Sequence, residues 1–196
     1  MGVEYEWKFS AEPELLSAIE KAYPGNRVTF QMETTYYDTP SGALSARHYT
    51  LRRRLENSIS VCTLKTPKGA ARAEWEIHCE NITEAIKLLE KTDCPADFFT
   101  LVKEGISPIC AARFTRIALE IPLENAVVEL ALDQGVLLGG GKEEPLCEVE
   151  VELKSGCTAD CDLFAKTLAA RFGLKLQPKS KFRRALSLYC SNLKGE

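Results

Sequence analysis

The segment CEVEVELK, residues 147–154, alternates without exception between apolar and charged side chains. Glu148, Glu150, Glu152 and Lys154 fall on one face of an extended chain, opposite Cys147, Val149, Val151 and Leu153. A period of two predicts a β-strand with one apolar and one ionic face. This strand is the starting point for the rest of the chain.

Six further segments carry the same alternation, an additional short strand fits residues 34–37, and helical spacing of apolar residues occupies the stretches between them. The predicted strands are 3–9, 34–37, 50–55, 60–65, 72–77, 115–121 and 127–133. The predicted helices are 12–23, 81–91, 95–103, 158–172 and a last one from about Ser180. Without a repeat or long linker, this order predicts one α+β domain over residues 1–196.

The ionic faces gather charges of one sign. Arg52 and Arg54 share one strand face, whereas Arg53 points to the opposite, surface-exposed face. For a single strand, a solvated polar face is the simpler interpretation. Across all strands, same-sign clusters favour an enclosed space that holds an ion or ligand of opposite charge. We therefore predict an eight-stranded antiparallel β-barrel tunnel with a charged lumen and helices packed outside.

The predicted lumen combines acids with bases. Carboxylates without accompanying His or Cys suit hard cations such as Mg²⁺ or Mn²⁺. Converging Arg and Lys suit a phosphate-rich anion. The acids are Glu4, Glu6, Glu129, Asp133, Glu148, Glu150 and Glu152, and the bases are Lys8, Arg52, Arg54, Lys65, Arg72, Arg116, Lys181 and Arg184.

The composition excludes several other classes of protein. A net charge of −3 gives no overall attraction to nucleic acid or to an anionic membrane. No apolar run approaches the ~20 residues of a membrane helix. The N-terminus carries acids where a secretory signal carries bases, so we expect a cytoplasmic protein with reduced cysteines.

The motifs in this chain resemble those of the CYTH family, also called triphosphate tunnel metalloenzymes. The E-x-E-x-K motif of Glu4, Glu6 and Lys8 opens the chain, and further family-like segments follow in order. They are 36–40 (YYDTP), 51–54 (LRRR), 63–65 (TLK), 72–76 (RAEWE), 129–135 (ELALDQG), 147–156 (CEVEVELKSG) and Ser180-Lys181-x-x-Arg184. The resemblance covers nearly the whole chain and is strongest to bacterial inorganic triphosphatases.

The resemblance implies roles for these residues. It marks Glu4 and Glu6 as metal ligands, with the second acidic cluster in the late strands. The predicted catalytic residues are Glu4, Glu6, Lys8 and Lys65. The predicted substrate-binding residues are Lys8, Arg52, Arg54, Lys65, Arg72, Arg116, Lys181 and Arg184. The predicted metal ligands are Glu4, Glu6, Asp133, Glu148, Glu150 and Glu152, supported by Glu74, Glu76 and Glu129. One departure is the segment Phe182-Arg183-Arg184-Ala185-Leu186, where relatives often have Gly-Tyr after the arginine.

The implied reaction is attack of an activated water on a terminal phosphoryl group. Inorganic triphosphate, cleaved to pyrophosphate and phosphate, is the preferred substrate, since no adenine- or thiazole-recognition feature is evident. Thiamine triphosphate, nucleoside triphosphates and the cyclisation of ATP are alternatives on the same scaffold. A non-catalytic polyphosphate-binding module is the alternative from another class. The resemblance also allows a homodimer.

Overall fold

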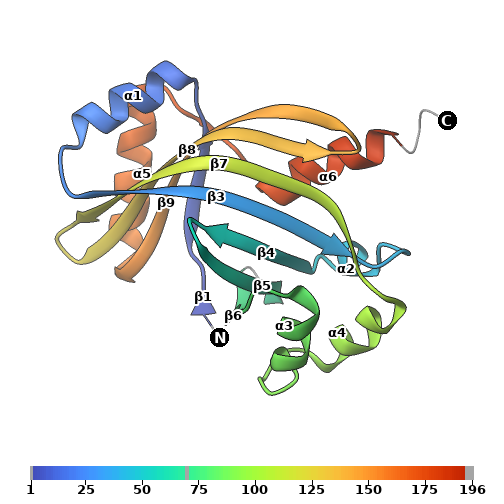
Figure 1. Ribbon diagram of the computed structural model, residues 1–196. Coiled ribbons are helices and arrows are strands. Elements are labelled where there is room, and N and C mark those ends of the chain that lie inside the picture. The colour runs from blue at the N-terminus through green and yellow to red at the C-terminus, as the bar shows by residue number, and fades with distance from the viewer. Residues whose placement is uncertain (1, 69–70, 193–196) are drawn as a thin grey trace.

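A computed structural model describes residues 2–68 and 71–192 of the chain (Figure 1). Ten strands of this part form one curved antiparallel sheet in the order β1-β6-β5-β4-β3-β7-β8-β9-β2-β10. The strands are β1 (Gly2–Val3), β2 (Glu6–Ser10), β3 (Arg27–Asp38), β4 (Thr50–Glu56), β5 (Ile59–Lys68), β6 (Ala71–His78), β7 (Ser107–Pro122), β8 (Ala126–Gly139), β9 (Lys142–Gly156) and β10 (Lys175–Leu176).

The N-terminal segment joins the two ends of this sheet. β1 pairs with β6 and β2 pairs with β9, although only Glu4 and Tyr5 separate β1 from β2. The order of hydrogen-bonded strands is open, but the segment bridges its ends, so the sheet encloses a tunnel. With β1 and β2 taken as two parts of one interrupted strand, the eight predicted strands are present, and short β10 is additional. The predicted α+β class with an antiparallel, barrel-like tunnel is confirmed.

Two groups of helices cover the outer face of the sheet (Figure 1). α1 (Pro13–Ala22) and α5 (Thr158–Phe172) pack on the outward apolar residues of β7, β8 and β9, such as Leu130 and Val151. α2 (Ala43–Ala46), α3 (Ile82–Leu89) and α4 (Ala96–Leu101), which the short 3₁₀ helix η1 (Val102–Glu104) follows, lie over β4, β5 and β6. Burial of these apolar faces leaves the ionic faces of the strands directed inward.

The last helix, α6 (Lys181–Asn192), lies on the inner face of the sheet, unlike the others. Its residues Phe182 and Ala185 pack with inward residues of β3, β7 and β8, including Tyr36 and Phe114. Gly139 of β8 makes this approach possible, because a Cβ there would lie 2.3 Å from the carbonyl oxygen of Ala185. The helix therefore packs on the apolar part of the inner face.

The observed strands are longer than the predicted ones. β3 spans Arg27–Asp38, whereas only residues 34–37 were predicted. The arrangement of its two faces is also the reverse of the one predicted, with apolar instead of ionic side chains inside. Met32 faces the interior and is buried, while Gln31 and Glu33 are exposed. No helix covers the outer face of β3 at this point in Figure 1, which explains why its polar residues point outward.

Candidate active site

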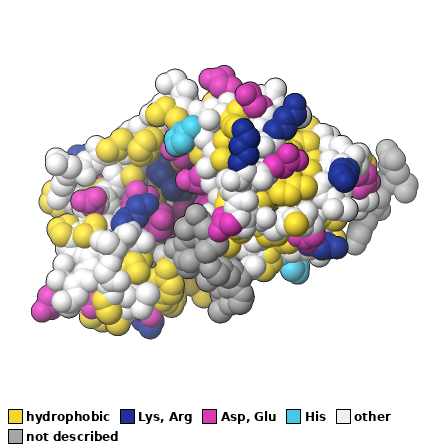
Figure 2. All heavy atoms as spheres, turned by 90° about the horizontal axis from the view of Figure 1, so that it is seen from below, with side chains coloured by type: hydrophobic (Ala, Val, Ile, Leu, Met, Phe, Trp, Pro, Cys, Tyr) yellow, Lys and Arg dark blue, Asp and Glu magenta, His cyan; other side chains and the backbone are white. Residues whose placement is uncertain are grey.

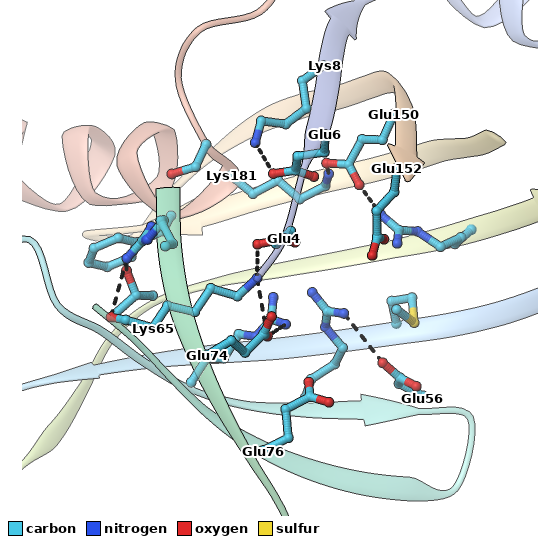
Figure 3. A pocket seen from close by; sticks show the side chains of 18 of the residues that line it. Glu4, Glu6, Lys8, Glu56, Lys65, Glu74, Glu76, Glu150, Glu152 and Lys181 are labelled. Carbon is cyan, nitrogen blue, oxygen red and sulfur yellow. Dashed lines mark hydrogen bonds and ion pairs between the residues drawn. The ribbon is translucent and has the colours of Figure 1, made fainter. Parts of the chain in front are cut away.

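The tunnel holds a cavity of about 370 Å³ whose lining is mostly ionic (Figure 3). Fourteen predicted site residues line it: Glu4, Glu6, Lys8, Arg52, Arg54, Lys65, Arg72, Glu74, Glu76, Arg116, Glu129, Glu150, Glu152 and Lys181. On the face drawn in Figure 2, basic and acidic side chains lie together in a hollow. The structure therefore brings most of the predicted residues to one enclosed space.

The N-terminal segment contributes Glu4 and Glu6 to this cavity. Lys65 Nζ lies 2.6 Å from Glu4 Oε2, and Lys8 forms an ion pair with Glu6. Glu4 lies in the break between β1 and β2, where the extended chain crosses from one sheet end to the other. The flanking outward residues Tyr5 and Trp7 anchor this crossing on α5, as their Oη and Nε1 atoms donate to one carboxylate oxygen of Asp162 at 2.5 and 2.8 Å.

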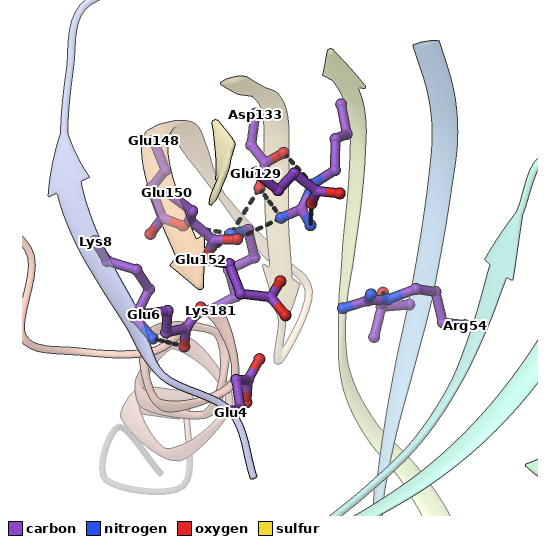
Figure 4. A network of polar contacts seen from close by, with 12 residues as sticks. Glu4, Glu6, Lys8, Arg54, Glu129, Asp133, Glu148, Glu150, Glu152 and Lys181 are labelled. Carbon is purple, nitrogen blue, oxygen red and sulfur yellow. Dashed lines mark hydrogen bonds and ion pairs between the residues drawn. The ribbon is translucent and has the colours of Figure 1, made fainter. Parts of the chain in front are cut away.

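A second group of ions surrounds Lys181, the first residue of α6 (Figure 4). Its Nζ lies 2.8 Å from Asp133, 2.5 Å from Glu148 and 2.8 Å from Glu150. Arg116 adds a bidentate pair to Asp133, with both N–O distances 2.7 Å, and also pairs with Glu150. Burial alone would raise the pKa of Glu150, but Lys181, Arg116 and Lys8 hold that pKa well below its usual range.

Three predicted residues lie behind the cavity wall. Asp133 and Glu148 are fully buried, and neither lines the cavity. Arg184 pairs with Glu148 at 2.6 Å and with Glu144 at 2.8 Å, which directs it away from the tunnel. Alternation identified the correct strand face for Asp133 and Glu148 but not their depth along the tunnel.

The opposite wall, formed by β4, β5 and β6, is rich in bases. Arg52 Nη2 lies 3.6 Å from Glu74, while the buried Arg52 Nε has no hydrogen-bond partner among the described residues. Burial and the nearby charges of Arg52 and Arg116 lower the pKa of Arg54. Figure 4 shows Arg54 pointing across the cavity toward Glu152. A guanidinium with an unpartnered buried N–H, beside another guanidinium of like charge, is an arrangement that an anionic ligand would satisfy.

The carboxylates differ in how well they suit a divalent cation. Asp133, Glu148 and Glu150 offer oxygens within 4.8 Å of one another, but the ammonium of Lys181 already lies among them. In contrast, burial and the charges of Glu150 and Glu4 raise the pKa of Glu6 despite its Lys8 partner. Burial also raises the pKa of Glu152, against the influence of Lys154. Under-neutralised carboxylates facing the cavity, with oxygen donors only, fit a hard cation such as Mg²⁺ or Mn²⁺.

The lining also includes residues that sequence reasoning did not assign to the site. They are Phe30, Met32, Tyr36, Thr50, Glu56, Lys154, Ser180 and Phe182. Glu56 lies two residues after Arg54, and Lys154 lies two residues after Glu152. The alternation of the sequence therefore indicated that both face inward. The aromatic and Met residues were missed because they are apolar residues on an otherwise ionic inner face.

Comparison with known proteins shows which family shares this architecture. The model of the CYTH domain matches residues 2–186. The chain belongs to the CYTH family. An inorganic triphosphatase of Haemophilus influenzae is 29% identical over 167 residues, which cover 79% of this chain and 45% of that protein. The chain therefore spans less than half the length of this curated relative.

Solved structures share the CYTH fold at low sequence identity. HpAC1 of Hippeastrum, a candidate adenylyl cyclase described as having a dominant triphosphatase activity, superimposes with a TM-score of 0.65 at 17% identity, covering 98% of this chain and 96% of that chain. The PH1819 protein of Pyrococcus horikoshii gives 0.63 at 20% identity, covering 94% of this chain and 98% of that chain. Among the described residues, no helix is both long and apolar enough to cross a membrane.

Proposed function

We propose that this CYTH protein hydrolyses inorganic triphosphate to pyrophosphate and phosphate, with Mg²⁺ or Mn²⁺ as cofactor. The observation that carries the proposal is that two opposite walls of one cavity each hold charges that their neighbours do not fully neutralise. One wall presents guanidinium groups that repel one another, with Arg52 Nε unpartnered. The other presents carboxylates that repel one another. A triphosphate with a bound cation would satisfy both walls.

The residues divide the work as follows. Glu4 and Glu6 would hold the cation, which would polarise the terminal phosphoryl group and neutralise its charge. Arg52, Arg54, Lys65 and Arg116 would bind the phosphate oxygens and stabilise the charge that develops on the leaving pyrophosphate. Asp133 and Glu148 act indirectly, because they hold Lys181 in place.

Hydrolysis needs an acceptor for the proton of the attacking water. The water oxygen forms a bond to the terminal phosphorus, the bridging P–O bond breaks, and the pyrophosphate oxygen takes the electron pair. Glu152 suits the acceptor role because burial and the neighbouring Glu129 and Glu4 raise its pKa toward neutrality, although Lys154 opposes this shift.

The relatives support this choice of reaction. The Haemophilus influenzae protein is an inorganic triphosphatase, and HpAC1 is described with a dominant triphosphatase activity. The cavity is lined mainly by charged side chains, which favours a substrate made wholly of phosphate. We further propose that the protein acts in the cytoplasm on a small-molecule substrate.

A phosphate-release assay tests the proposal. The purified chain is given inorganic triphosphate, ATP or thiamine triphosphate, each with Mg²⁺, with Mn²⁺ or with a chelator. We expect the fastest release from inorganic triphosphate and none with the chelator. Faster release from ATP or thiamine triphosphate would assign the substrate differently. Tight binding of triphosphate with no release from any substrate would make the protein a binding module instead.

A further inference from the structure

A second cavity, of about 320 Å³, adjoins the tunnel. Thr50, Arg72, Ser180 and Phe182 line both spaces, so the second cavity continues the first at the end where α6 begins. None of the roles assigned to the tunnel residues requires this space. Its lining is chemically different from that of the tunnel.

The difference lies in the balance of charge. Eight acidic and eight basic side chains line the tunnel. Of the described residues, no carboxylate lines the second cavity, whereas Arg72 and Arg183 both do. An anion that entered this space would meet positive potential without needing a cation to screen carboxylates.

Arg72 is the one base of the tunnel lining without an acidic partner among the described residues. The seven other bases each have a carboxylate oxygen within 4.0 Å. Arg72 Nη2 instead donates to neutral oxygens, namely the carbonyl of His48 at 3.1 Å and Thr50 Oγ1 at 3.0 Å. Burial lowers the pKa of Arg72, against the influence of Glu4. Among the described residues, the hydrogen bonds of this half-buried guanidinium go to neutral groups, so an anionic ligand could still pair with its charge.

Arg183 faces the same cavity from α6 and is also held by a neutral group. Its Nη2 lies 3.0 Å from Nδ1 of His48. A guanidinium only donates, so Nδ1 of His48 is the acceptor in this hydrogen bond. Among the described residues, no carboxylate lies within 4.0 Å of Arg183, and its side chain is exposed.

The start of α6 adds a third positive feature. Ser180 lines the cavity, and its Oγ accepts a hydrogen bond from the backbone N–H of Arg183 at 3.2 Å, as a residue that caps a helix does. The N-terminus of a helix carries partial positive charge and favours anions. Two guanidinium groups that have no carboxylate partner among the described residues, and a helix N-terminus, thus border one space that no described carboxylate lines.

We propose that this cavity is a subsite for an additional phosphoryl group of a linear polyphosphate longer than triphosphate. The inference rests on the proposed function, which places three phosphoryl groups in the adjoining tunnel. A linear polyphosphate carries negative charge on every phosphoryl group, so the part of the chain that extends past Arg72 needs cationic partners. Pro67, Phe182 and Leu186 supply the apolar part of the lining beside these cationic groups.

Steady-state kinetics with two chain lengths tests the subsite. Initial rates of phosphate release are measured with inorganic triphosphate and linear tetraphosphate for the wild type, Arg183→Ala and Arg113→Ala. Arg113 is exposed on β7, so its replacement removes the same charge elsewhere. We expect Arg183→Ala to raise the KM for tetraphosphate roughly tenfold. Its KM for triphosphate should stay within about twofold of the wild type, and Arg113→Ala should change neither constant.

Other outcomes overturn the subsite without touching the proposed function. If Arg183→Ala raises both KM values equally, or changes neither, the cavity does not recognise the extra phosphoryl group. If the wild type releases phosphate from neither compound, the proposed function fails, and calorimetric titration with the same two compounds and Mg²⁺ decides the subsite. A preference for tetraphosphate that Arg183→Ala abolishes would support it, and equal affinities for both chain lengths in the wild type would refute it.

Discussion

At the scale of single residues, the ammonium of Lys181 lies where three clustered carboxylates would otherwise attract a metal ion. Asp133, Glu148 and Glu150 surround it at 2.5 to 2.8 Å. Burial alone would lower the pKa of Lys181, but these three acids raise it above its ordinary value. The lysine therefore stays charged and links α6 to the acidic wall of the tunnel.

Replacement of Lys181 tests this role. Lys181→Met leaves three buried carboxylates short of one positive charge, so we expect the free energy of unfolding in urea to fall by about 3–5 kcal/mol. Lys154→Met is the control, because its ion pairs are more exposed and contribute less than about 1 kcal/mol. Equal losses in the two variants would show that Lys181 is no more important to stability than a surface lysine.

A second residue-scale prediction concerns the metal. Glu6→Gln removes a charge from the carboxylates that face the cavity, so the Mg²⁺ concentration for half-maximal phosphate release should rise about tenfold or more. Glu33→Gln makes the same exchange on the exposed face of β3 and should leave that concentration unchanged. An unaltered Mg²⁺ requirement in Glu6→Gln would remove Glu6 from the metal site.

Alternation in the sequence predicts which face a residue occupies but not its depth. It placed Arg52, Glu150 and Lys65 correctly in the cavity lining. It could not show that Glu148 is buried beside Lys181 and does not line the cavity, because that depends on where α6 packs on the inner face of the sheet. The position of α6 is set by contacts between segments far apart in the chain, such as Tyr36 with Phe182.

At the scale of elements, the link between β1 and β2 depends on one carboxylate of α5. Asp162 accepts hydrogen bonds from Tyr5 and Trp7, the residues on either side of Glu6. These bonds hold the pKa of Asp162 below its ordinary value. The hydrogen bonds from Tyr5 and Trp7 to Asp162 hold in place the backbone that carries the predicted metal ligands.

Loss of the hydrogen bonds to Asp162 should make residues 4–8 more mobile. We expect Asp162→Ala to speed amide hydrogen exchange in residues 4–8 and to raise the Mg²⁺ requirement, because the Glu6 carboxylate is then less firmly positioned. Asp160→Ala, in the first turn of the same helix, breaks contacts to Asn125 instead and should leave exchange in residues 4–8 unchanged. Slow exchange in residues 4–8 of Asp162→Ala would show that other contacts hold the segment.

The packing of α6 on β8 is the second element-scale feature open to test. Gly139→Ala adds a methyl group that would meet the Ala185 carbonyl oxygen at 2.3 Å, so we expect a loss of stability of about 1–3 kcal/mol together with reduced phosphate release. Gly25→Ala is the control, because nothing lies within 4 Å of its added Cβ. Equal stability of the two variants in urea would contradict the close packing of α6.

Most strands and outer helices could be predicted because their burial follows the usual rule of apolar residues toward the core. Asn81, where the sequence predicts a helix to start, caps α3 by accepting hydrogen bonds from the backbone N–H groups of Thr83 and Glu84. The first half of β3 and the inner position of α6 could not be predicted. In both, apolar residues such as Met32 and Phe182 face the interior and form an apolar cluster next to the ionic lining of the cavity. Sequence periodicity alone does not reveal which side of the sheet is enclosed.

At the scale of the whole molecule, the curled sheet converts alternating strands into two environments. Outward apolar faces form cores with the helices, and inward ionic faces share one cavity. Protein surrounds much of this cavity, so its fixed charges act on a bound ligand more strongly than the same charges would on an open surface. The proposed hydrolysis depends on this enclosure more than on any single residue.

Neighbouring arginines on β4 test the enclosure most directly, because Arg54 lines the cavity and Arg53 does not. The measurement is the calorimetric affinity for inorganic triphosphate with Mg²⁺ in Arg54→Ala and Arg53→Ala. We predict that Arg54→Ala weakens binding roughly tenfold or more, through loss of a charge-assisted hydrogen bond, while Arg53→Ala stays near the wild type. Equal weakening in both variants, or weakening in Arg53→Ala alone, would contradict a phosphate-binding tunnel.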